Sequence, residues 1–319
     1  MMKPLLEISK TGILPTVSFK DVESAVKTVK ALELHGINVI EIMLRSNASI
    51  DAIKAIKDHY PDFIVGAGTI KSIEDVERTL EAGASFFVLP YWDEAVVNYC
   101  LEKNLPVVPA VSSAKEIALA EKLGLECVKF FPAEPLGGTS ALELYSGAFK
   151  TMKFIPTGGI TQDNFKSYLN LPCVSAVGGG FMLDKSALEN NDYIAVTESI
   201  GQTILKQFNF RTKHVGINMD SESDAFSLAG QMASLFGKTI RNGSKSVMVG
   251  SDVEVMKFNY HGDKGHIGIA SDDVDRAYHY LSKRGVIFIE DTIAYDSHGK
   301  IKVAYLKESY GGFAIHLMR

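Results

Sequence analysis

Short apolar runs alternate with amphipathic stretches from residue 13 to about residue 208. The apolar runs are continuous rather than alternating, which is typical of strands that are buried on both faces. We expect eight such strands, at Ile13–Val17, Val39–Met43, Phe63–Ala67, Phe86–Leu89, Val107–Ala110, Cys127–Phe131, Phe154–Pro156 and Ser175–Val177.

The stretches between these runs carry helix signals. Ser72 precedes one stretch with Asp75 three residues on, a capping arrangement, and Gly83 closes it. We expect helices at Asp21–His35, Ile73–Ala82, Ser113–Leu123 and Asp184–Phe208. Strands that alternate with helices over this length predict an α/β fold, a (β/α)₈ TIM barrel. The rival, a doubly wound open sheet, is not favoured, because the sequence has no phosphate-loop motif and no dinucleotide fingerprint.

The pattern changes after Asn209. Two successive units of strands and one helix follow, and the segments "HVGINM" (214–219) and "HIGIAS" (266–271) begin them in the same way. Strands are expected at Phe210–Ile217, Ser246–Val249, Val253–Tyr260, His266–Ala270, Val286–Glu290, Val303–Lys307 and Phe313–Met318, and helices at Asp224–Phe236 and Asp272–Arg284. We therefore expect a barrel at residues 1–208 and a smaller α+β domain of duplicated βαβββ units at residues 209–319.

Composition narrows the classes of function. The 319 residues carry a formal net charge of −5 and no basic run, so we expect no nucleic-acid partner. No stretch is long and apolar enough to cross a bilayer, and Met1–Lys10 lacks the layout of a signal peptide. Cys100, Cys127 and Cys173 are widely spaced, which indicates buried thiols in a reducing cytoplasm.

Two charged residues interrupt apolar runs near the ends of predicted strands, where barrel enzymes place their chemistry. Lys129 lies in "CVKFFP", and burial would favour the neutral amine that attack on a ketone requires. Glu41 lies in "VIEIMLR" with Arg45 four residues on. Glu41 could carry protons, and Arg45 could bind a substrate carboxylate. The alternatives are a lysine whose head reaches water and a structural ion pair.

Glycine runs follow the seventh and eighth predicted strands, as Thr157–Gly158–Gly159 and Gly178–Gly179–Gly180. Glycines at these loops allow backbone N–H groups to converge on an anion, and this part of a barrel is a recurrent phosphate site. Tight βα turns are the alternative explanation.

Together these segments resemble the 2-keto-3-deoxy-6-phosphogluconate (KDPG) / 4-hydroxy-2-oxoglutarate (KHG) aldolase family. The segments that carry the resemblance over roughly residues 5–206 are "ILPTV" (13–17), "VIEIMLRS" (39–46), "IVGAGTI" (64–70), "KFFPAE" (129–134), "PTGGI" (156–160) and "VGGG" (178–180). The resemblance implies a class I lyase that cleaves a 2-keto acid to pyruvate and an aldehyde, requires no metal or cofactor, and forms a homotrimer.

The resemblance also implies roles for residues. Lys129 would form the imine and Glu41 would carry protons. The substrate would contact Arg45, Thr69, Pro90, Phe131, Thr157, Gly158, Gly159, Gly179 and Gly180.

Three departures from the family pattern bear on the substrate. Gly180 stands where the family usually has serine, which removes one hydroxyl donor to phosphate. Leu89–Pro90–Tyr91 replaces Ser-Pro-Gly, and Pro109–Ala110 replaces Pro-Gly. These changes leave the imine chemistry alone and keep three substrates open: the phosphorylated sugar acid, 4-hydroxy-2-oxoglutarate, and a related unphosphorylated keto acid.

Residues 210–319 resemble a vicinal-oxygen-chelate (glyoxalase-like) domain, through "HVGI", "HIGIASDDVDRAYHYLSKRG" and "GGFAIHLM". The resemblance places candidate divalent-metal ligands at His214, Glu254, His266 and His316, with His316 where glutamate is usual. Three interpretations of this region stay open: a metal-dependent dioxygenase or isomerase, a structural or ligand-sensing domain, and a sensor whose barrel is inactive.

Overall fold

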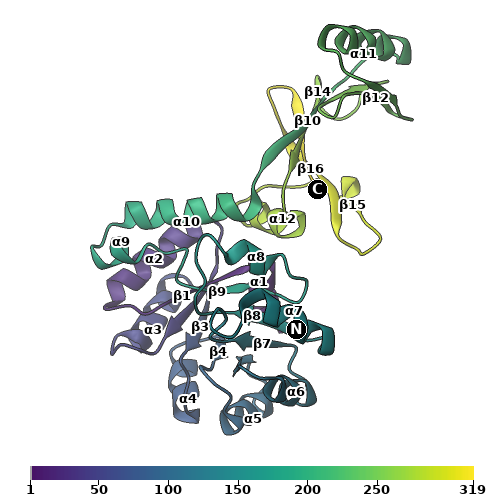
Figure 1. The fold of residues 1–319 in the computed structure, drawn as a ribbon. Coiled ribbons are helices and arrows are strands. Elements are labelled where there is room, and N and C mark those ends of the chain that lie inside the picture. The colour runs from purple at the N-terminus through teal and green to yellow at the C-terminus, as the bar shows by residue number, and fades with distance from the viewer. Residues whose placement is uncertain (1) are drawn as a thin grey trace. The chain divides into compact units, whose positions relative to one another are not determined.

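The computed structural model describes residues 2–319, and the chain divides into two compact units. The first extends to Ile204 and the second runs from Leu205 to Arg319, so the division falls within helix α10 (Tyr193–Phe208). Figure 1 shows parallel strands surrounded by helices in the first unit, and a separate sheet with two helices in the second.

The first unit is an α/β, TIM-like arrangement of parallel strands. Its strands are β1 (Ile13–Val17), β2 (Val39–Met43), β3 (Ile64–Gly68), β4 (Phe86–Val88), β5 (Val107–Val108), β6 (Ala110–Val111), β7 (Cys127–Phe130), β8 (Lys153–Pro156) and β9 (Val177–Gly179). One described sheet has the order β5-β4-β3-β2-β1-β9 and another the order β6-β7-β8. Parallel bridges Phe154↔Val174 and Thr157↔Gly178 link β8 to the segment around β9. Pro109 separates β5 from β6 because proline has no N–H for the ladder.

The helices of this unit lie between successive strands: α1 (Lys3–Thr11), α2 (Val22–Leu34), α3 (Ser49–His59), α4 (Ile73–Glu81), α5 (Glu94–Glu102), α6 (Ala114–Lys122), α7 (Gly138–Ala148), α8 (Phe165–Leu169), α9 (Lys185–Glu189) and α10. Short polar side chains cap several of them. The expected cap at Ser72 is confirmed, because its hydroxyl accepts from the Asp75 N–H at 3.1 Å. Such a cap typically contributes about 1 kcal/mol.

Several expected elements differ from the structure. The single helix expected at Asp184–Phe208 is two helices, because Asn191 adopts a left-handed conformation (φ +56°) that ends α9. The strand expected at Val286–Glu290 is wrong: only Phe288 bridges to Leu306, and a short 3₁₀ turn, η1 (Glu290–Thr292), follows. Helices α1, α3, α5, α7 and α8 were not predicted from the pattern.

The second unit contains one antiparallel-rich sheet in the order β11-β12-β13-β10-β14-β17-β16-β15. Its elements are β10 (Arg211–Ile217), α11 (Glu222–Phe236), β11 (Ile240–Asn242), β12 (Ser246–Val249), β13 (Val253–Met256), β14 (Gly265–Ala270), α12 (Val274–Lys283), β15 (Ala294–Tyr295), β16 (Ile301–Tyr310) and β17 (Phe313–Met318).

The two halves of this sheet repeat each other. In each half the first strand pairs in parallel with the last, β10 with β13 and β14 with β17. The first strands of the halves, β10 and β14, pair with each other in antiparallel orientation. The sheet therefore has an internal pseudo-twofold relation between two βαβββ units.

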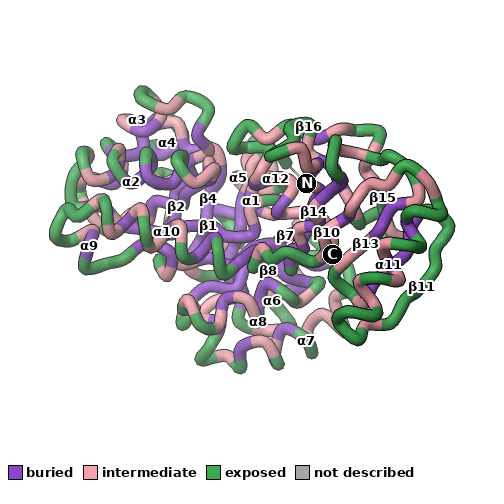
Figure 2. Tube along the Cα trace, turned by 90° about the horizontal axis from the view of Figure 1, so that it is seen from above, coloured by how far each residue is buried: buried purple, intermediate pink, exposed green. Residues whose placement is uncertain are grey.

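Burial concentrates on the strands of the first unit, as Figure 2 shows for β1, β2 and β4. All residues of β1 and β7 are buried, whereas the helices alternate buried and exposed positions. The three cysteines are free and buried, as expected. Within residues 2–319, no helix combines the length and apolar character that crossing a membrane requires.

Candidate active site

The amine of Lys129 and the carboxylate of Glu41 meet inside the barrel. Lys129 Nζ lies 3.4 Å from Glu41 Oε1, and the two residues are only 7% and 1% exposed. Lys129 projects from β7 and Glu41 from β2, 88 residues apart in sequence. Both lie within their strands rather than at the strand ends where we expected them. An amine and a carboxylate in contact and shielded from water provide a nucleophile with an adjacent proton carrier.

Neighbouring strands make room for Glu41. A Cβ added to Gly68 at the end of β3 would overlap the Glu41 carboxylate, so a larger residue there would displace that carboxylate. On the other side, Thr16 of β1 donates its hydroxyl toward Glu41 Oε2 at 3.4 Å. Thr16 was missed by the sequence reasoning, although a hydroxyl in the buried run "ILPTV" was a signal for it.

Thr69 and Phe131 complete this region. Thr69 directly follows β3 and has φ +62°, an unfavourable backbone conformation for a β-branched residue. Strain of this kind clusters at functional sites. The Phe131 ring lies 5.4 Å from Lys129 Nζ and so forms one wall beside the amine. Pro90 lies just beyond β4, and the backbone of Ile70 donates to Val88 there, which ties the ends of β3 and β4 together.

The glycines after β8 adopt conformations that other residues avoid. Gly158 and Gly159 have φ +94° and +81°, and a Cβ on either would press on Phe131 or Glu134. Gly178 leaves space for the Thr157 hydroxyl, and Gly179 has φ +158°. These turns are therefore required by local packing as well as by any anion they bind.

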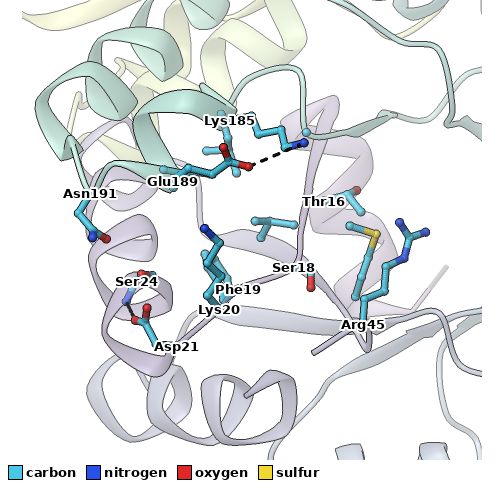
Figure 3. A pocket seen from close by; sticks show the side chains of 15 residues that line it. Thr16, Ser18, Phe19, Lys20, Asp21, Ser24, Arg45, Lys185, Glu189 and Asn191 are labelled. Atoms are coloured by element: carbon cyan, nitrogen blue, oxygen red, sulfur yellow. Dashed lines mark hydrogen bonds and ion pairs between the residues drawn. The ribbon is translucent and has the colours of Figure 1, made fainter. Parts of the chain in front are cut away.

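Arg45 and Gly180 line a pocket of about 540 Å³ at the end of the barrel where β1 and β2 finish. Thr16, which donates to Glu41, lines this pocket too, whereas Glu41 and Lys129 do not line it. Figure 3 shows the Arg45 guanidinium and Thr16 on the same side of this pocket. Arg45 is exposed and therefore accessible to a substrate carboxylate.

Cys127 precedes Lys129 by two residues on β7 and is buried. Burial raises the pKa of the Cys127 thiol to about 12, so the thiol stays protonated at physiological pH. Lys129 is therefore the better candidate for covalent chemistry.

In the second unit, four predicted ligand atoms converge. Nε2 of His214 lies 3.1 Å from Nε2 of His266 and 3.2 Å from Nε2 of His316. Oε2 of Glu254 lies 3.2 Å from the His266 nitrogen and 3.4 Å from that of His214. The three histidines form a group that could hold a metal ion.

The pseudo-twofold relation of the sheet assembles this cluster. His214 and His266 occupy the first strands of the two halves, and Glu254 and His316 the last. Across the β10–β14 pair, His266 lies opposite Gly216, and a Cβ on Gly216 would overlap its ring. Gly268 makes the same space for His214. In the shared "H-x-G" pattern, the glycine of each half thus leaves room on the sheet for the imidazole of the other half.

Burial and mutual contact lower the pKa values of three members of the cluster, His214, Glu254 and His316. Desolvation, followed by the neighbouring His214 and His266, lowers the pKa of His316 to about 3. The hydrogen bond from His266 lowers the pKa of Glu254 to about 2, with a further bond from Ser246. Desolvation also lowers the pKa of His214. Near neutral pH His214 and His316 are therefore neutral and Glu254 is ionised, the forms that bind metals.

Comparison with known proteins covers the first unit. The sequence model of the family described as KDPG and KHG aldolase matches residues 6–199. A KHG/KDPG aldolase of Escherichia coli (strain K12) is 38% identical over 192 residues, which make up 60% of this chain and 90% of that protein.

Solved structures agree. A KDPG aldolase from Legionella pneumophila, with pyruvate captured as a covalent carbinolamine intermediate, aligns with a TM-score of 0.61 and 31% identity over 63% of this chain and 98% of that one. The 2-keto-3-deoxy-6-phosphogluconate aldolase of Zymomonas mobilis with 3-phosphoglycerate aligns with a TM-score of 0.58 and 30% identity over 62% and 95% of the two chains.

Proposed function

The chain belongs to the KDPG and KHG aldolase family, and from this premise we propose that Lys129 and Glu41 carry out a Schiff-base cleavage of a 2-keto acid. The single observation that carries the proposal is the buried contact of 3.4 Å between Lys129 Nζ and Glu41 Oε1. The enzyme is a class I lyase, and chemistry of this kind needs neither metal nor cofactor because the imine itself withdraws electrons.

The geometry supports one order of steps. The Lys129 amine adds to the C2 carbonyl and water leaves, which forms an iminium. A carboxylate of Glu41 takes the proton of the C4 hydroxyl, and the C3–C4 bond breaks as its electron pair moves toward the iminium. The aldehyde leaves, C3 of the enamine takes up a proton, and water then releases pyruvate and restores the amine.

The remaining predicted residues would hold the substrate around this centre. In our proposal Arg45 and Thr69 hold the carboxylate end, with Pro90 and Phe131 beside the reacting carbons. Thr157, Gly158, Gly159, Gly179 and Gly180 would line the distal end. The substrates we propose are KDPG, KHG or both, with an unphosphorylated 2-keto acid as the alternative.

Borohydride trapping tests the assignment. Pyruvate and borohydride should convert Lys129 to a stable secondary amine, which peptide mass mapping locates. The variant Lys129→Met should give no adduct, whereas Lys122→Met, which changes an exposed lysine on α6, should label as the wild type does. Labelling of a different lysine, or none in the wild type, would refute the proposal.

A second candidate function rests on the histidine cluster. We propose that residues 209–319 form a glyoxalase-like domain that holds a divalent metal through His214, Glu254, His266 and His316. Ligand atoms 2.0–2.2 Å from a tetrahedral or octahedral ion lie about 2.8–3.6 Å apart. Four of the separations, 3.1–3.4 Å, fall within that range, and the three histidine atoms all lie within 4.8 Å of one another.

The imidazole and carboxylate groups of the cluster also support a metal site, although one feature differs from usual metal sites. Imidazole and carboxylate donors favour zinc, iron, nickel or manganese. Nδ1 of His266 and Nδ1 of His316 are buried, and within residues 2–319 neither has a hydrogen-bond partner, whereas metal-binding histidines normally donate from this atom. Packing in the sheet holds these rings instead. A bound ion would supply a Lewis acid for an oxygen ligand.

Metal analysis of the purified full chain tests this second candidate. Dialysis against zinc, nickel or cobalt followed by elemental analysis should give one ion per chain. No stoichiometric ion under any of the three conditions would leave a structural or ligand-sensing domain as the better interpretation.

We further propose a homotrimer in the cytoplasm. The family resemblance supports the trimer, and the three free buried cysteines support a reducing compartment. Light scattering coupled to size exclusion tests the oligomeric state directly.

A further inference from the structure

Glu134 ends the segment "KFFPAE", and the proposed reaction gives this residue no role. It lies on the loop that joins β7 to α7, and its side chain is exposed. One carboxylate oxygen, Oε1, accepts hydrogen bonds from the Tyr168 hydroxyl and from Asn164 Nδ2, the latter at 3.2 Å. Because both donors belong to the next loop and helix of the chain, Glu134 links two neighbouring βα units.

Both donors are held by their own surroundings. Tyr168 on α8 is 1% exposed. Burial, followed by the hydrogen bond to Glu134, raises the pKa of its hydroxyl, so the hydroxyl stays protonated and can donate. Asn164 Oδ1 accepts from the Thr161 N–H at 2.8 Å. With that oxygen engaged, Asn164 Nδ2 donates to Glu134 and also to the Gly159 carbonyl, 3.1 Å away.

The turn after β8 is fixed by these bonds. Gly158 and Gly159 both have positive φ and carry no side chain that could hold the turn in place. The Glu134 N–H donates to the Gly158 carbonyl at 3.1 Å, and Asn164 binds the Gly159 carbonyl. In a trans peptide the C=O and N–H point in opposite directions, so the N–H groups of Gly159 and Ile160 are directed away from the two donors. Within residues 2–319, neither N–H has an acceptor.

The same turn touches the wall beside the reactive amine. A Cβ added to Gly158 would lie 3.1 Å from the Phe131 ring, so the turn packs directly against this ring. Phe131 is held separately, because its own N–H donates to the Val111 carbonyl at 3.3 Å. Loss of the bonds to Glu134 would therefore free the turn while the ring and the amine keep their supports.

We propose that Glu134 is a positioning residue that, through Asn164, holds the Gly158–Gly159 turn where the aldehyde part of the substrate meets it. This inference rests on the proposed aldolase function, in which Gly158 and Gly159 line the distal end. In this role Glu134 acts through its acceptor oxygen and takes no part in proton transfer. Glutamine keeps such an oxygen and would replace it, whereas alanine would not.

Steady-state cleavage of KDPG and KHG tests this role. Glu134→Ala should raise KM about tenfold for whichever substrate the wild type cleaves, the effect of one lost hydrogen bond, and should change kcat less than about threefold. Glu134→Gln should keep KM within about twofold of the wild type. Glu102→Ala removes an exposed carboxylate from α5 and is the matched control, which should leave both constants unchanged.

Pyruvate provides a readout that separates a displaced turn from a loosened barrel. In the proposed reaction pyruvate is the part that stays on the amine, while the aldehyde part lies at the turn. The pyruvate concentration that gives half-maximal borohydride trapping on Lys129 should therefore be the same in Glu134→Ala and in the wild type. A rise in this concentration equal to the rise in KM would indicate general loosening and would overturn the positioning role.

Two further variants test the path from Glu134 to the turn. Asn164→Ala removes the bonds to both Glu134 and Gly159, so it should raise KM at least as much as Glu134→Ala. Tyr168→Phe keeps the buried ring and removes one donor that does not bind the turn, so it should raise KM less. A larger rise in Tyr168→Phe than in Asn164→Ala would contradict this path.

The inference can fail independently of the proposed function. If pyruvate and borohydride label Lys129 while Glu134→Ala keeps the wild-type KM, the positioning role is wrong and the aldolase stands. An equal loss of kcat in Glu134→Ala and Glu134→Gln would also overturn it, because the charge would then take part in the chemistry. If Lys129 is not labelled in the wild type, the aldolase assignment itself fails.

Discussion

The barrel and the C-terminal sheet both bring polar groups into their interiors, but the two groups differ in what they still need. In the barrel, the Lys129 amine can donate to the Glu41 carboxylate, so each group satisfies the other. In the sheet, three imidazole nitrogens and one carboxylate oxygen converge, with contacts of 3.1–3.4 Å. Converging lone pairs repel unless a cation or proton lies among them. The comparison teaches that the barrel pairs a donor with an acceptor, while the sheet gathers nitrogens and an oxygen where a cation or a shared proton would fit.

The largest expected effect is on the rate of cleavage in the barrel, when the Lys129 amine is removed. Lys129→Met should lower kcat by about 10⁴-fold or more, because it removes the amine that we propose forms the imine. A coupled assay of pyruvate release gives the rate, with Lys122→Met as the control. Residual activity within about tenfold of the wild type would show that the covalent residue lies elsewhere.

Removing the proton carrier should have the next largest effect. Glu41→Gln keeps the shape but cannot take up a proton, so we expect kcat to fall about 10²- to 10⁴-fold. Trapping of pyruvate on Lys129 should persist in this variant, though more slowly. An unchanged kcat would mean that the carboxylate only balances the amine.

On the other side of the comparison, removing one imidazole should break the cluster. His266→Ala should weaken zinc or nickel binding about 100-fold or more, measured by calorimetry, because one of four donors is lost. Pyruvate release by the barrel should stay the same. His298→Ala, at an exposed position, is the matched control, and equal affinity in the two variants would contradict the site.

Acid should destabilise the C-terminal sheet even without metal. The folded pKa of His316 is about 3, below its ordinary value of 6.5. Between these two pH values the unfolded chain binds a proton at His316 that the folded chain does not bind. This contribution to stability is therefore complete above pH 6.5 and declines as the pH falls toward 3. Between pH 7.5 and 5 we expect a loss of about 2 kcal/mol from His316, and the lowered pKa of His214 acts in the same direction.

Hydrogen exchange in β17, corrected for intrinsic rates, measures this loss. His316→Gln cannot be protonated, so its exchange should depend less on pH. The Glu254 contribution is a separate one, because its lowered pKa removes stability only as the pH falls from about 4.5 toward 2. Equal pH dependence in the wild type and in His316→Gln would contradict the assignment.

The smallest expected effect concerns Thr16. Its hydroxyl contacts Glu41 Oε2 at 3.4 Å, a long hydrogen bond, so Thr16→Val should lower kcat only about two- to tenfold. Thr16→Ser retains the hydroxyl and should recover the rate. If Val and Ser behave alike, the hydroxyl does not position the carboxylate.

Local patterns predicted the strands well because burial on both faces leaves continuous apolar runs. β1, β2, β12 and β17 have the expected bounds. Lys129 and Glu41 were recognisable because a charge inside such a run is unusual, but their contact joins residues 88 apart and is created only by closure of the fold. Helices α3 and α5 were not recognised although both carry buried apolar residues, because α3 begins without a side-chain cap and α5 has only 9 residues.

Some of the other differences have local causes and some depend on the whole sheet. The break at Asn191 follows from one residue in the left-handed region, which the Asn-Asn sequence there could have indicated. The strand expected at Val286–Glu290 had the right composition but pairs only at Phe288, since pairing partners are set by the whole sheet. In the histidine cluster, the sequence supplied the four candidates, while their separations required the coordinates.

The twofold repeat of the C-terminal sheet makes assembly of the four-residue cluster independent of the protein concentration. Each half contributes one member from its first strand and one from its last, so neither half could present more than two donors alone. As separate chains, the halves would have to meet before all four donors could assemble. Tandem fusion turns that encounter into an event within one molecule, with a high and fixed effective molarity. A dilute cell extract would therefore contain the same proportion of assembled sites as a concentrated one.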